Sequence, residues 1–265
     1  MNSISSLQNP QIKNIVRLSS KSKERMAQGL FVIEGARELS LALSGEYEPE
    51  SVFLCRELFA ATDYPEVMQR IDASIINEVT RPVFEKIAYR EGSDGILALA
   101  KTRSHGLSGL KWGENPFFIV LESVEKPGNL GAILRTADAA QVSGVIVCDP
   151  STDVYNPNVI RSGVGCLFTV PIAVCTSEEA LHWMKQNGIR TYAAELTAAQ
   201  WYHETDFRSP SAVIMGTEAD GLTPFWLEQA DARIKIPMRG EIDSLNVSVS
   251  TAVIVFEAMR QRGFE

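Results

Sequence analysis

The sequence predicts an α/β protein of two domains, the second of them built on a parallel sheet covered by helices. The chain has 265 residues, and at about 150 residues per domain this length indicates two domains. Apolar, strand-like runs alternate with helical segments along most of the chain, as they do in parallel sheets. The irregular, polar run Lys101–Glu114 interrupts this alternation and indicates a linker. We therefore expect domains over 1–105 and 116–265, joined by a linker at 106–115.

The first domain is predicted to alternate strands and helices after a basic N-terminal segment. Phe31–Ile33 is an apolar run that ends at Glu34 and Gly35, which is typical of a short strand. The leucine-rich segment 36–44 follows and ends at Gly45, which indicates a helix. The predicted elements of this domain are a basic helix at 12–27, strands at 31–33, 51–55, 73–76 and 95–100, and helices at 36–44 and 83–88.

The second domain contains the most apolar strands of the chain. The runs 117–121 and 144–148 hold no polar side chain except Cys148, as expected for central parallel strands that are buried on both faces. Further strands and the helices between them follow at regular intervals, which predicts a helix-covered parallel sheet. The remaining predicted elements are strands at 191–194, 212–215 and 233–236, and helices at 129–142, 157–164, 178–187, 224–230 and 247–262.

Composition describes an ordinary globular protein with one basic segment. Hydrophobic residues make up 45% of the chain and charged residues 22%, which excludes fibrous and largely disordered classes. The formal net charge is −8, and this alone argues against nucleic acid as a partner. The first 27 residues are nevertheless basic, and a small basic region suffices to bind phosphate. The charged residues of this segment are Lys13, Arg17, Lys21, Lys23 and Arg25 against Glu24.

Cysteine usage and hydropathy predict a protein of the reducing cytoplasm. The four cysteines form no Cys-x-x-Cys pair, so we expect free thiols. The N-terminal segment has no apolar signal core, and no apolar run approaches the roughly 20 residues that span a bilayer. The three histidines lie far apart, so we expect no metal site.

The first motif that carries chemistry follows the predicted strand 117–121. Asn129 stands where a helix N-cap is expected, and Arg135 and Asp138 share one face of the helix that follows. On the residues alone, a simple cap and an ion pair explain this segment as well as a catalytic role does.

The second and third motifs follow two later strands. Gly216-x-Glu218-x-x-Gly221 comes directly after the strand 212–215, and parallel sheets bind ligands at the carboxyl ends of their strands. Ile236-Pro237-Met238 ends another strand, and a long polar loop leads to Ser244-Leu245-Asn246-Val247-Ser248 at the start of a helix. Capping accounts for Ser244 and Asn246, but it leaves the long loop unexplained.

In this order and at this spacing, the three motifs resemble those of the SpoU (TrmH-like) RNA 2′-O-ribose methyltransferases of the SPOUT superfamily. The segment Tyr155–Ser162 between the motifs is also similar, and the resemblance covers about 116–265. Residues 31–100 more weakly resemble the N-terminal substrate-binding domain of many members, which is shaped like a class of ribosomal RNA-binding proteins. The fold that the resemblance implies is a SPOUT-type parallel sheet with a deep trefoil knot, against the general rule that chains do not thread, and a small N-terminal α/β RNA-binding domain.

The resemblance also implies a set of functional residues and partners. S-adenosylmethionine would be the methyl donor and would contact Gly216, Ile236 and Leu245 mainly through the backbone. The implied partners are RNA and a second copy of the chain, because members are usually homodimers. The implied catalytic residues are Arg135, Asn129, Glu218, Ser244 and Asn246, and the basic residues expected to bind RNA are Lys13, Arg17, Lys21 and Lys23.

The predicted reaction is methyl transfer from S-adenosylmethionine to a ribose 2′-hydroxyl, which would make DNA a non-substrate. Ribosomal RNA is the expected substrate because, in the family resembled, an extra N-terminal domain is commoner in the branch that acts on ribosomal RNA. Transfer RNA is the alternative substrate. The rival classes are a catalytically silent RNA-binding protein of the same fold and a dinucleotide-dependent oxidoreductase, although the chain lacks a full Gly-x-Gly-x-x-Gly fingerprint.

Overall fold

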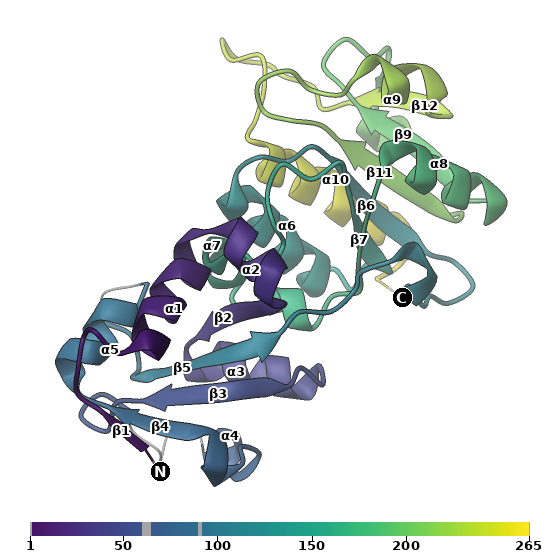
Figure 1. The fold of residues 1–265 in the computed structure, drawn as a ribbon. Coiled ribbons are helices and arrows are strands. Elements are labelled where there is room, and N and C mark those ends of the chain that lie inside the picture. The colour runs from purple at the N-terminus through teal and green to yellow at the C-terminus, as the bar shows by residue number, and fades with distance from the viewer. Residues whose placement is uncertain (1, 60–64, 90–91, 265) are drawn as a thin grey trace. The chain divides into compact units, whose positions relative to one another are not determined.

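The structure is a computed structural model that describes residues 2–59, 65–89 and 92–264, and the chain packs into two compact units (Figure 1). The first unit holds the residues up to Arg103 together with Asp153–Thr169, and the second holds Ser104–Thr152 and the chain from Val170 onward. The segment Asp153–Thr169, which the sequence assigned to the second domain, therefore packs with the first unit. The domain boundaries at 105 and 116 stay a prediction.

The first unit is a mixed sheet covered by short helices. Its strand order is β1-β4-β3-β5-β2, in which β5 is antiparallel to both of its neighbours. Ile12, Ile15 and Leu18 recur every third residue on the first helix and are fully buried in the core. The elements are β1 (Asn2–Ile4), α1 (Pro10–Ser20), α2 (Ser22–Gln28), β2 (Leu30–Glu34), α3 (Ala36–Ser44), β3 (Pro49–Leu54), α4 (Pro65–Gln69), η1 (Ala73–Ile75), β4 (Ile76–Val79), α5 (Arg81–Ile87), β5 (Ile96–Lys101), α7 (Pro157–Ser162) and η3 (Cys166–Phe168).

Two predicted elements of this unit were wrong in detail. The single basic helix at 12–27 is two helices, because Lys21 has extended backbone angles (φ −124°, ψ 114°) and separates α1 from α2. The strand expected at 73–76 begins only at Ile76. The Asp72 carboxylate accepts a hydrogen bond from the Ser74 backbone N–H at 2.8 Å, which stabilises a 3₁₀ turn in front of the strand.

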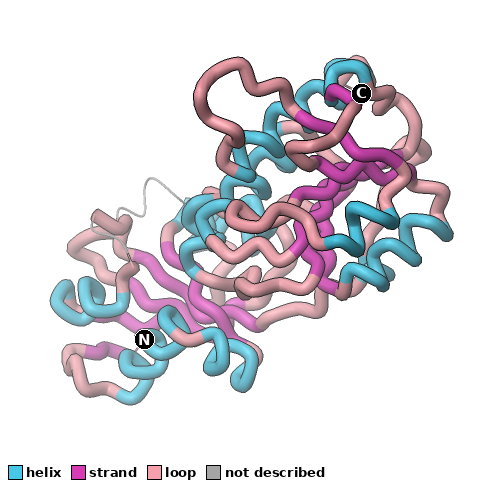
Figure 2. Tube along the Cα trace, turned by 90° about the horizontal axis from the view of Figure 1, so that it is seen from above, coloured by secondary structure: helices cyan, strands magenta, loops and turns pink. Residues whose placement is uncertain are grey.

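The second unit is an all-parallel sheet with helices around it, as predicted (Figure 2). Its strand order is β10-β12-β9-β11-β6-β7-β8, and β11 and β6 at its centre are buried along their whole length. The strand-like run around Cys175 is β8, which was not among the expected strands, and the two-residue edge strand β10 was not predicted. The elements are η2 (Leu107–Gly109), β6 (Phe117–Glu122), α6 (Pro127–Ala139), β7 (Gly144–Cys148), β8 (Ile172–Cys175), α8 (Ser177–Gln186), β9 (Arg190–Ala194), β10 (Gln200–Trp201), η4 (Tyr202–Glu204), β11 (Ser211–Met215), α9 (Pro224–Gln229), β12 (Ala232–Lys235) and α10 (Val247–Gln261).

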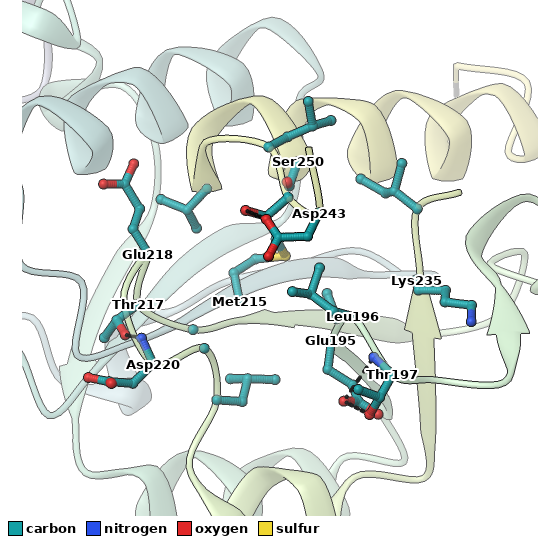
Figure 3. Close-up of a pocket in the computed structure, with 18 of the residues that line it drawn as sticks. Glu195, Leu196, Thr197, Met215, Thr217, Glu218, Asp220, Lys235, Asp243 and Ser250 are labelled. Atoms are coloured by element: carbon teal, nitrogen blue, oxygen red, sulfur yellow. Dashed lines mark hydrogen bonds between the residues drawn. The ribbon is translucent and has the colours of Figure 1, made fainter. Parts of the chain in front are cut away.

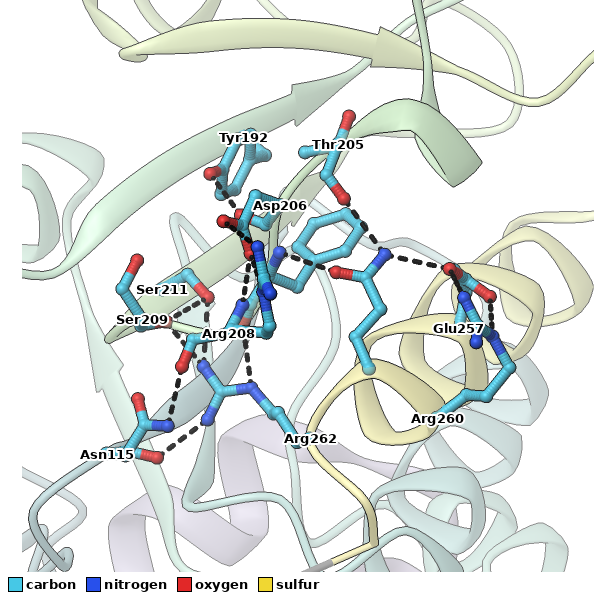
Figure 4. A network of polar contacts seen from close by, with 12 residues as sticks. Asn115, Tyr192, Thr205, Asp206, Arg208, Ser209, Ser211, Glu257, Arg260 and Arg262 are labelled. Carbon is cyan, nitrogen blue, oxygen red and sulfur yellow. Dashed lines mark hydrogen bonds and ion pairs between the residues drawn. The ribbon is translucent and has the colours of Figure 1, made fainter.

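The last helix, α10, is anchored at its carboxyl end by Arg262 (Figure 4). The guanidinium donates hydrogen bonds to backbone carbonyls of two separate segments, at 2.7 Å to Asn115 in one, and at 2.7 Å to Phe207 and 2.6 Å to Ser209 in the other. Burial lowers the pKa of Arg262, and these carbonyls replace the water that its charge has lost. The anchor holds α10 against the sheet, so that the amino end of the helix keeps a defined place beside the strand ends.

Candidate active site

A cavity of about 410 Å³ opens in the second unit where β9, β11 and β12 end (Figure 3). This is the edge of a parallel sheet at which ligands bind. The loops after the three strands and the first turns of α10 form its walls. The predicted cofactor residues Gly216, Ile236 and Leu245 all line it, as do Glu218 and Ser244 of the predicted catalytic set.

Gly216 shapes the wall that follows β11. Beyond it the chain turns back on itself, and the Thr217 and Gly221 backbones exchange N–H···O hydrogen bonds of 3.0 and 3.2 Å. A Cβ atom on Gly216 would overlap the Gly221 backbone, so only glycine fits here. Gly221 itself has φ +69°, a conformation that also favours glycine. The two glycines of the second motif are therefore required by the closed turn.

Glu122, which the sequence analysis missed, fixes the far end of this turn. Its carboxylate lies at the end of β6 and is 3% exposed. It accepts hydrogen bonds from the Thr223 backbone N–H at 2.8 Å and the Thr223 hydroxyl at 2.6 Å. An acidic residue at the end of an otherwise apolar strand was the only signal in the sequence. The 216–222 loop is thus held at both ends before any ligand binds.

The three motifs meet at the Glu218 carboxylate. It accepts a hydrogen bond from the Asn129 side-chain amide at 3.0 Å and another from the Asn246 amide, and it forms an ion pair with Lys126. The Asn246 amide also donates to the Asn129 side-chain oxygen at 3.2 Å. Lys126, followed by the Asn129 and Asn246 amides, holds the pKa of Glu218 below its ordinary value. Glu218 is therefore a fixed anion that orients two amides.

Asn246 has a second function as the N-cap of α10. Its side-chain oxygen accepts from the Ser248 backbone N–H at 3.0 Å and from the Ser248 hydroxyl at 2.6 Å. The oxygen therefore holds the helix while the amide group holds Glu218. The capping expected from the sequence and the place of Asn246 in the site are both observed.

Asn129, in contrast, is not a helix cap, and that prediction was wrong. Helix α6 begins two residues earlier at Pro127, with Lys126 as its N-cap. Proline suits the first helical position, because the N–H that it lacks would have no partner there. Asn129 therefore lies inside the first turn, and its amide is free to bind Glu218.

Arg135 lies on α6, six residues after Asn129, with an exposed side chain. Within the described residues its guanidinium makes no hydrogen bond or ion pair, so the pairing with Asp138 that the sequence allowed does not occupy it. Ser244 is also exposed, and its hydroxyl donates to Asp243 at 3.1 Å instead of joining the Glu218 cluster. The catalytic roles of the five residues stay predictions.

The lining of the cavity suits S-adenosylmethionine in size and charge. Sites for ligands of this size usually enclose about 300–1,000 Å³. The described lining carries four carboxylates and one ammonium group, a balance that favours a ligand with a positively charged sulfonium. One polar part of this lining, at Glu195 and Thr197, was not predicted from the sequence, although it directly follows a parallel strand. The charged lining residues are Glu195, Glu218, Asp220, Asp243 and Lys235.

The basic N-terminal helices expose the four residues predicted to bind RNA. Lys13 and Arg17 lie on α1, Lys21 joins the two helices, and Lys23 lies on α2. Arg25 differs, since it is 2% exposed, forms an ion pair with Asp153, and donates to the Leu18 carbonyl at 2.6 Å. Arg25 therefore ties α2 to the segment Asp153–Thr169 and is not available to a ligand.

The described residues contain neither a membrane-spanning helix nor a candidate metal centre. None of the described helices is long and apolar enough to cross a membrane. In the same part of the chain, no three His, Cys, Asp or Glu side chains are placed to hold a metal ion.

The fold and the site together define an RNA methyltransferase of the SPOUT class. The chain belongs to the SpoU rRNA methylase family, whose sequence profile matches residues 116–256. The profile of an MRM3-like substrate binding domain matches residues 9–98. The predicted family, fold class and reaction class are therefore confirmed, while the trefoil knot is what this fold implies.

Named relatives and solved structures agree with this assignment. The 23S rRNA (guanosine-2′-O-)-methyltransferase RlmB of Vibrio parahaemolyticus is 34% identical over 71% of this chain and 78% of its own. A crystal structure of an RNA 2′-O ribose methyltransferase is 37% identical, covers 98% of this chain and 99% of its own, and superposes with a TM-score of 0.86. The AdoMet-bound rRNA methyltransferase of Sinorhizobium meliloti is 29% identical, covers 98% and 97%, and has a TM-score of 0.89.

Proposed function

We propose that this protein transfers the methyl group of S-adenosylmethionine to a ribose 2′-hydroxyl of ribosomal RNA. The observation that carries the proposal is the cluster at Glu218, where side chains of all three motifs meet beside a cavity of suitable size. Ribosomal RNA is supported by the relatives named for it and by the match to a substrate-binding domain in the first unit. A ribosomal substrate would place the reaction in the cytoplasm.

The residues of the chain would act mainly by positioning. When bound, S-adenosylmethionine supplies a methyl group that its sulfonium already activates. The backbone at Gly216, Ile236 and Leu245 would hold the donor, and the Glu218–Asn129–Asn246 cluster would keep the walls of the site in place while the ribose oxygen approaches in line. This cluster is assembled within the single chain, so the free protein already has a preorganised site.

Arg135 would bind the RNA beside the reacting ribose. A guanidinium keeps its proton in proteins, so Arg135 is poorly suited to act as a base by itself. It offers a planar pair of N–H donors that matches a phosphate, and its side chain is free to make this contact. We assign Arg135 to an RNA phosphate next to the 2′-hydroxyl, where its charge would polarise the nucleophile and assist the loss of its proton.

Transfer of labelled methyl groups to hypomethylated total RNA tests the function. We expect label in large ribosomal RNA, in dinucleotides that resist alkaline hydrolysis. Arg135→Ala should lower turnover at least ~100-fold, because it removes charge stabilisation at the reacting group, and it should leave cofactor affinity unchanged. Arg208→Ala, which removes an exposed arginine away from the cavity, is the matched control.

Other outcomes of this assay would select the rival functions. Label confined to transfer RNA would keep the chemistry and replace the substrate. Cofactor binding without any label would favour the silent RNA-binding protein. An Arg135→Ala variant with normal turnover would remove Arg135 from the reaction.

We further propose that the chain forms a homodimer and that α1 and α2 bind RNA. The homodimer is supported by apolar side chains that α10 leaves exposed. RNA binding by α1 and α2 is supported by the four exposed cations of the N-terminal segment.

A further inference from the structure

We propose that Glu195 binds the ribose hydroxyls of the adenosyl group of S-adenosylmethionine. The inference rests on the proposed function, because it assigns one more part of the same cofactor cavity. None of the three sequence motifs contains Glu195. It is the first residue after β9, and its side chain is 13% exposed.

Glu195 is held in place but keeps part of its capacity to accept hydrogen bonds. Its backbone N–H donates to the Ile234 carbonyl at 2.9 Å, which attaches the end of β9 to β12. One carboxylate oxygen, Oε2, accepts from the Thr197 hydroxyl at 2.7 Å and from the Thr197 backbone N–H at 3.4 Å. The Arg233 guanidinium forms an ion pair with the other oxygen, Oε1, at 3.8 Å, a distance too long for a hydrogen bond. A carboxylate has about four acceptor positions, so at least two remain for a ligand.

The position of the Glu218 cluster decides which arm of the cofactor lies at Glu195. The sulfonium carries three arms, a methyl group, an amino-acid chain and an adenosyl group. Under the proposed function the methyl group faces the RNA ribose, and therefore the side of the cavity where the Glu218–Asn129–Asn246 cluster lies. Figure 3 shows Glu218 and the Glu195–Thr197 pair on opposite sides of the cavity. One of the two other arms thus extends towards Glu195.

The character of the walls assigns the adenosyl arm to this side. Beside Glu195 the lining also has apolar side chains, among them Ile234, which is fully buried and in register with Ala194. Leu222 and Leu227 also line the cavity, Leu222 as part of the buried hydrophobic core of the second unit and Leu227 packed against that core. The flat adenine ring needs such walls. Near α10 the apolar Val247 and Ile254 are joined by polar side chains, which can bind the ammonium and carboxylate of the amino-acid arm. These polar residues are Asp243, Ser244 and Ser250.

A carboxylate at the edge of an apolar adenine site is well suited to the ribose diol. Two neighbouring hydroxyls can donate to the acceptor positions that remain on Glu195, as ribose hydroxyls do to acidic residues in dinucleotide-binding proteins. Thr197 would hold the carboxylate in the orientation that the diol requires. Glu195 would thereby select ribose over deoxyribose in the cofactor.

Calorimetric titration of the full chain with S-adenosylhomocysteine and its 2′-deoxy and 3′-deoxy analogues tests this contact without RNA. A hydroxyl that donates to a carboxylate contributes enough that each deoxy analogue should bind wild type about 10-fold more weakly. Glu195→Ala should bind S-adenosylhomocysteine about 10-fold more weakly than wild type does. Its preference for S-adenosylhomocysteine over the deoxy analogues should shrink to within about 2-fold. The ratio of the affinities of one variant for S-adenosylhomocysteine and a deoxy analogue does not depend on how much of that variant is folded. Glu195→Gln should also reduce this ratio.

Two results would overturn the inference. If wild type binds the deoxy analogues as tightly as S-adenosylhomocysteine, Glu195 does not bind the ribose hydroxyls. A Glu195→Ala variant that keeps the full preference would show that Glu195 binds another group, such as the ammonium. Glu204→Ala, an exposed acid that does not line the cavity, should keep the wild-type ratio. Methyl transfer is measured separately. If wild type transfers methyl groups but does not prefer S-adenosylhomocysteine over the deoxy analogues, only this contact is refuted. If it shows the preference but transfers no methyl group, only the proposed reaction is refuted.

Discussion

At the scale of single residues, the site depends on side chains that make more than one contact. Asn246 caps a helix with its oxygen and binds Glu218 with its amide, so a single substitution would disturb both the helix and the cluster. Glu218 accepts from Asn129, Asn246 and Lys126, and these donors stabilise its ionised form. A carboxylate held in this way is a poor proton acceptor, which favours a positioning role for Glu218 over a role as the base.

The low pKa of Glu218 leads to a prediction for Glu218→Gln. The new amide would face the donors of Asn129 and Asn246, so we expect methyl transfer to fall at least ~10-fold. The ionised carboxylate stabilises the folded state above the ordinary glutamate pKa of about 4.3, and this stabilisation is lost as pH falls through the lowered pKa. Urea unfolding should therefore show a stability difference from wild type that is constant from pH 6 to 8 and shrinks in acid. Glu228→Gln is the control, and a difference that grows in acid would contradict the assignment.

At the scale of elements, the sequence predicted the strands of the second unit well and the helix starts less well. Apolar runs such as 117–121 and 144–148 are unambiguous because burial on both faces leaves no other pattern. The start of α6 was misplaced because Asn129 is a good cap by residue type, and only the structure shows that Glu218 binds it instead. The three motifs could be found from the sequence, but the ion pair of Lys126 with Glu218 could not, since it joins residues 92 positions apart. Glu195 lines the cavity, and its place after a parallel strand was its one signal in the sequence.

The helices α1 and α2 carry the prediction about RNA. Changing Lys13, Arg17, Lys21 and Lys23 together to glutamine should weaken RNA binding and flatten its dependence on salt. Each phosphate contact contributes about 0.7–0.9 to the slope of log K against log salt concentration, so losing several contacts is measurable. Filter binding over a range of salt concentrations provides the test. The same change at Lys185, Arg190, Arg208 and Arg260, exposed cations of the other unit, is the control, and an unchanged slope for the first variant would exclude α1 and α2.

At the scale of the whole molecule, one segment packs in a different unit from the residues that flank it in sequence. Asp153–Thr169 lies between two strands of the second sheet in sequence, yet it packs in the first unit, where Asp153 pairs with the buried Arg25. Tyr155 and Phe168 of this segment contact Phe31 of β2, with ring centroids 4.3 and 6.1 Å away. This segment belongs to the part of the chain that the SpoU rRNA methylase profile matches. It nevertheless completes the core of the first unit, which the MRM3-like substrate binding domain profile matches. Local sequence patterns could not predict this exchange, because it depends on contacts between residues more than a hundred positions apart.

The outer face of α10 carries the prediction about assembly. Val249 and Phe256 are seven residues apart and therefore lie on one face of the helix, 48% and 42% exposed. Phe264, 62% exposed, lies beside Phe256 with ring centroids 6.5 Å apart. Apolar groups gathered in this way are typical of an interface between subunits. We therefore expect sedimentation velocity to show a dimer, and Phe256→Glu to shift it towards monomer by placing two charges at the interface. Met26→Glu, at a more exposed site in the other unit, should remain dimeric, and a monomeric wild type would refute the interface.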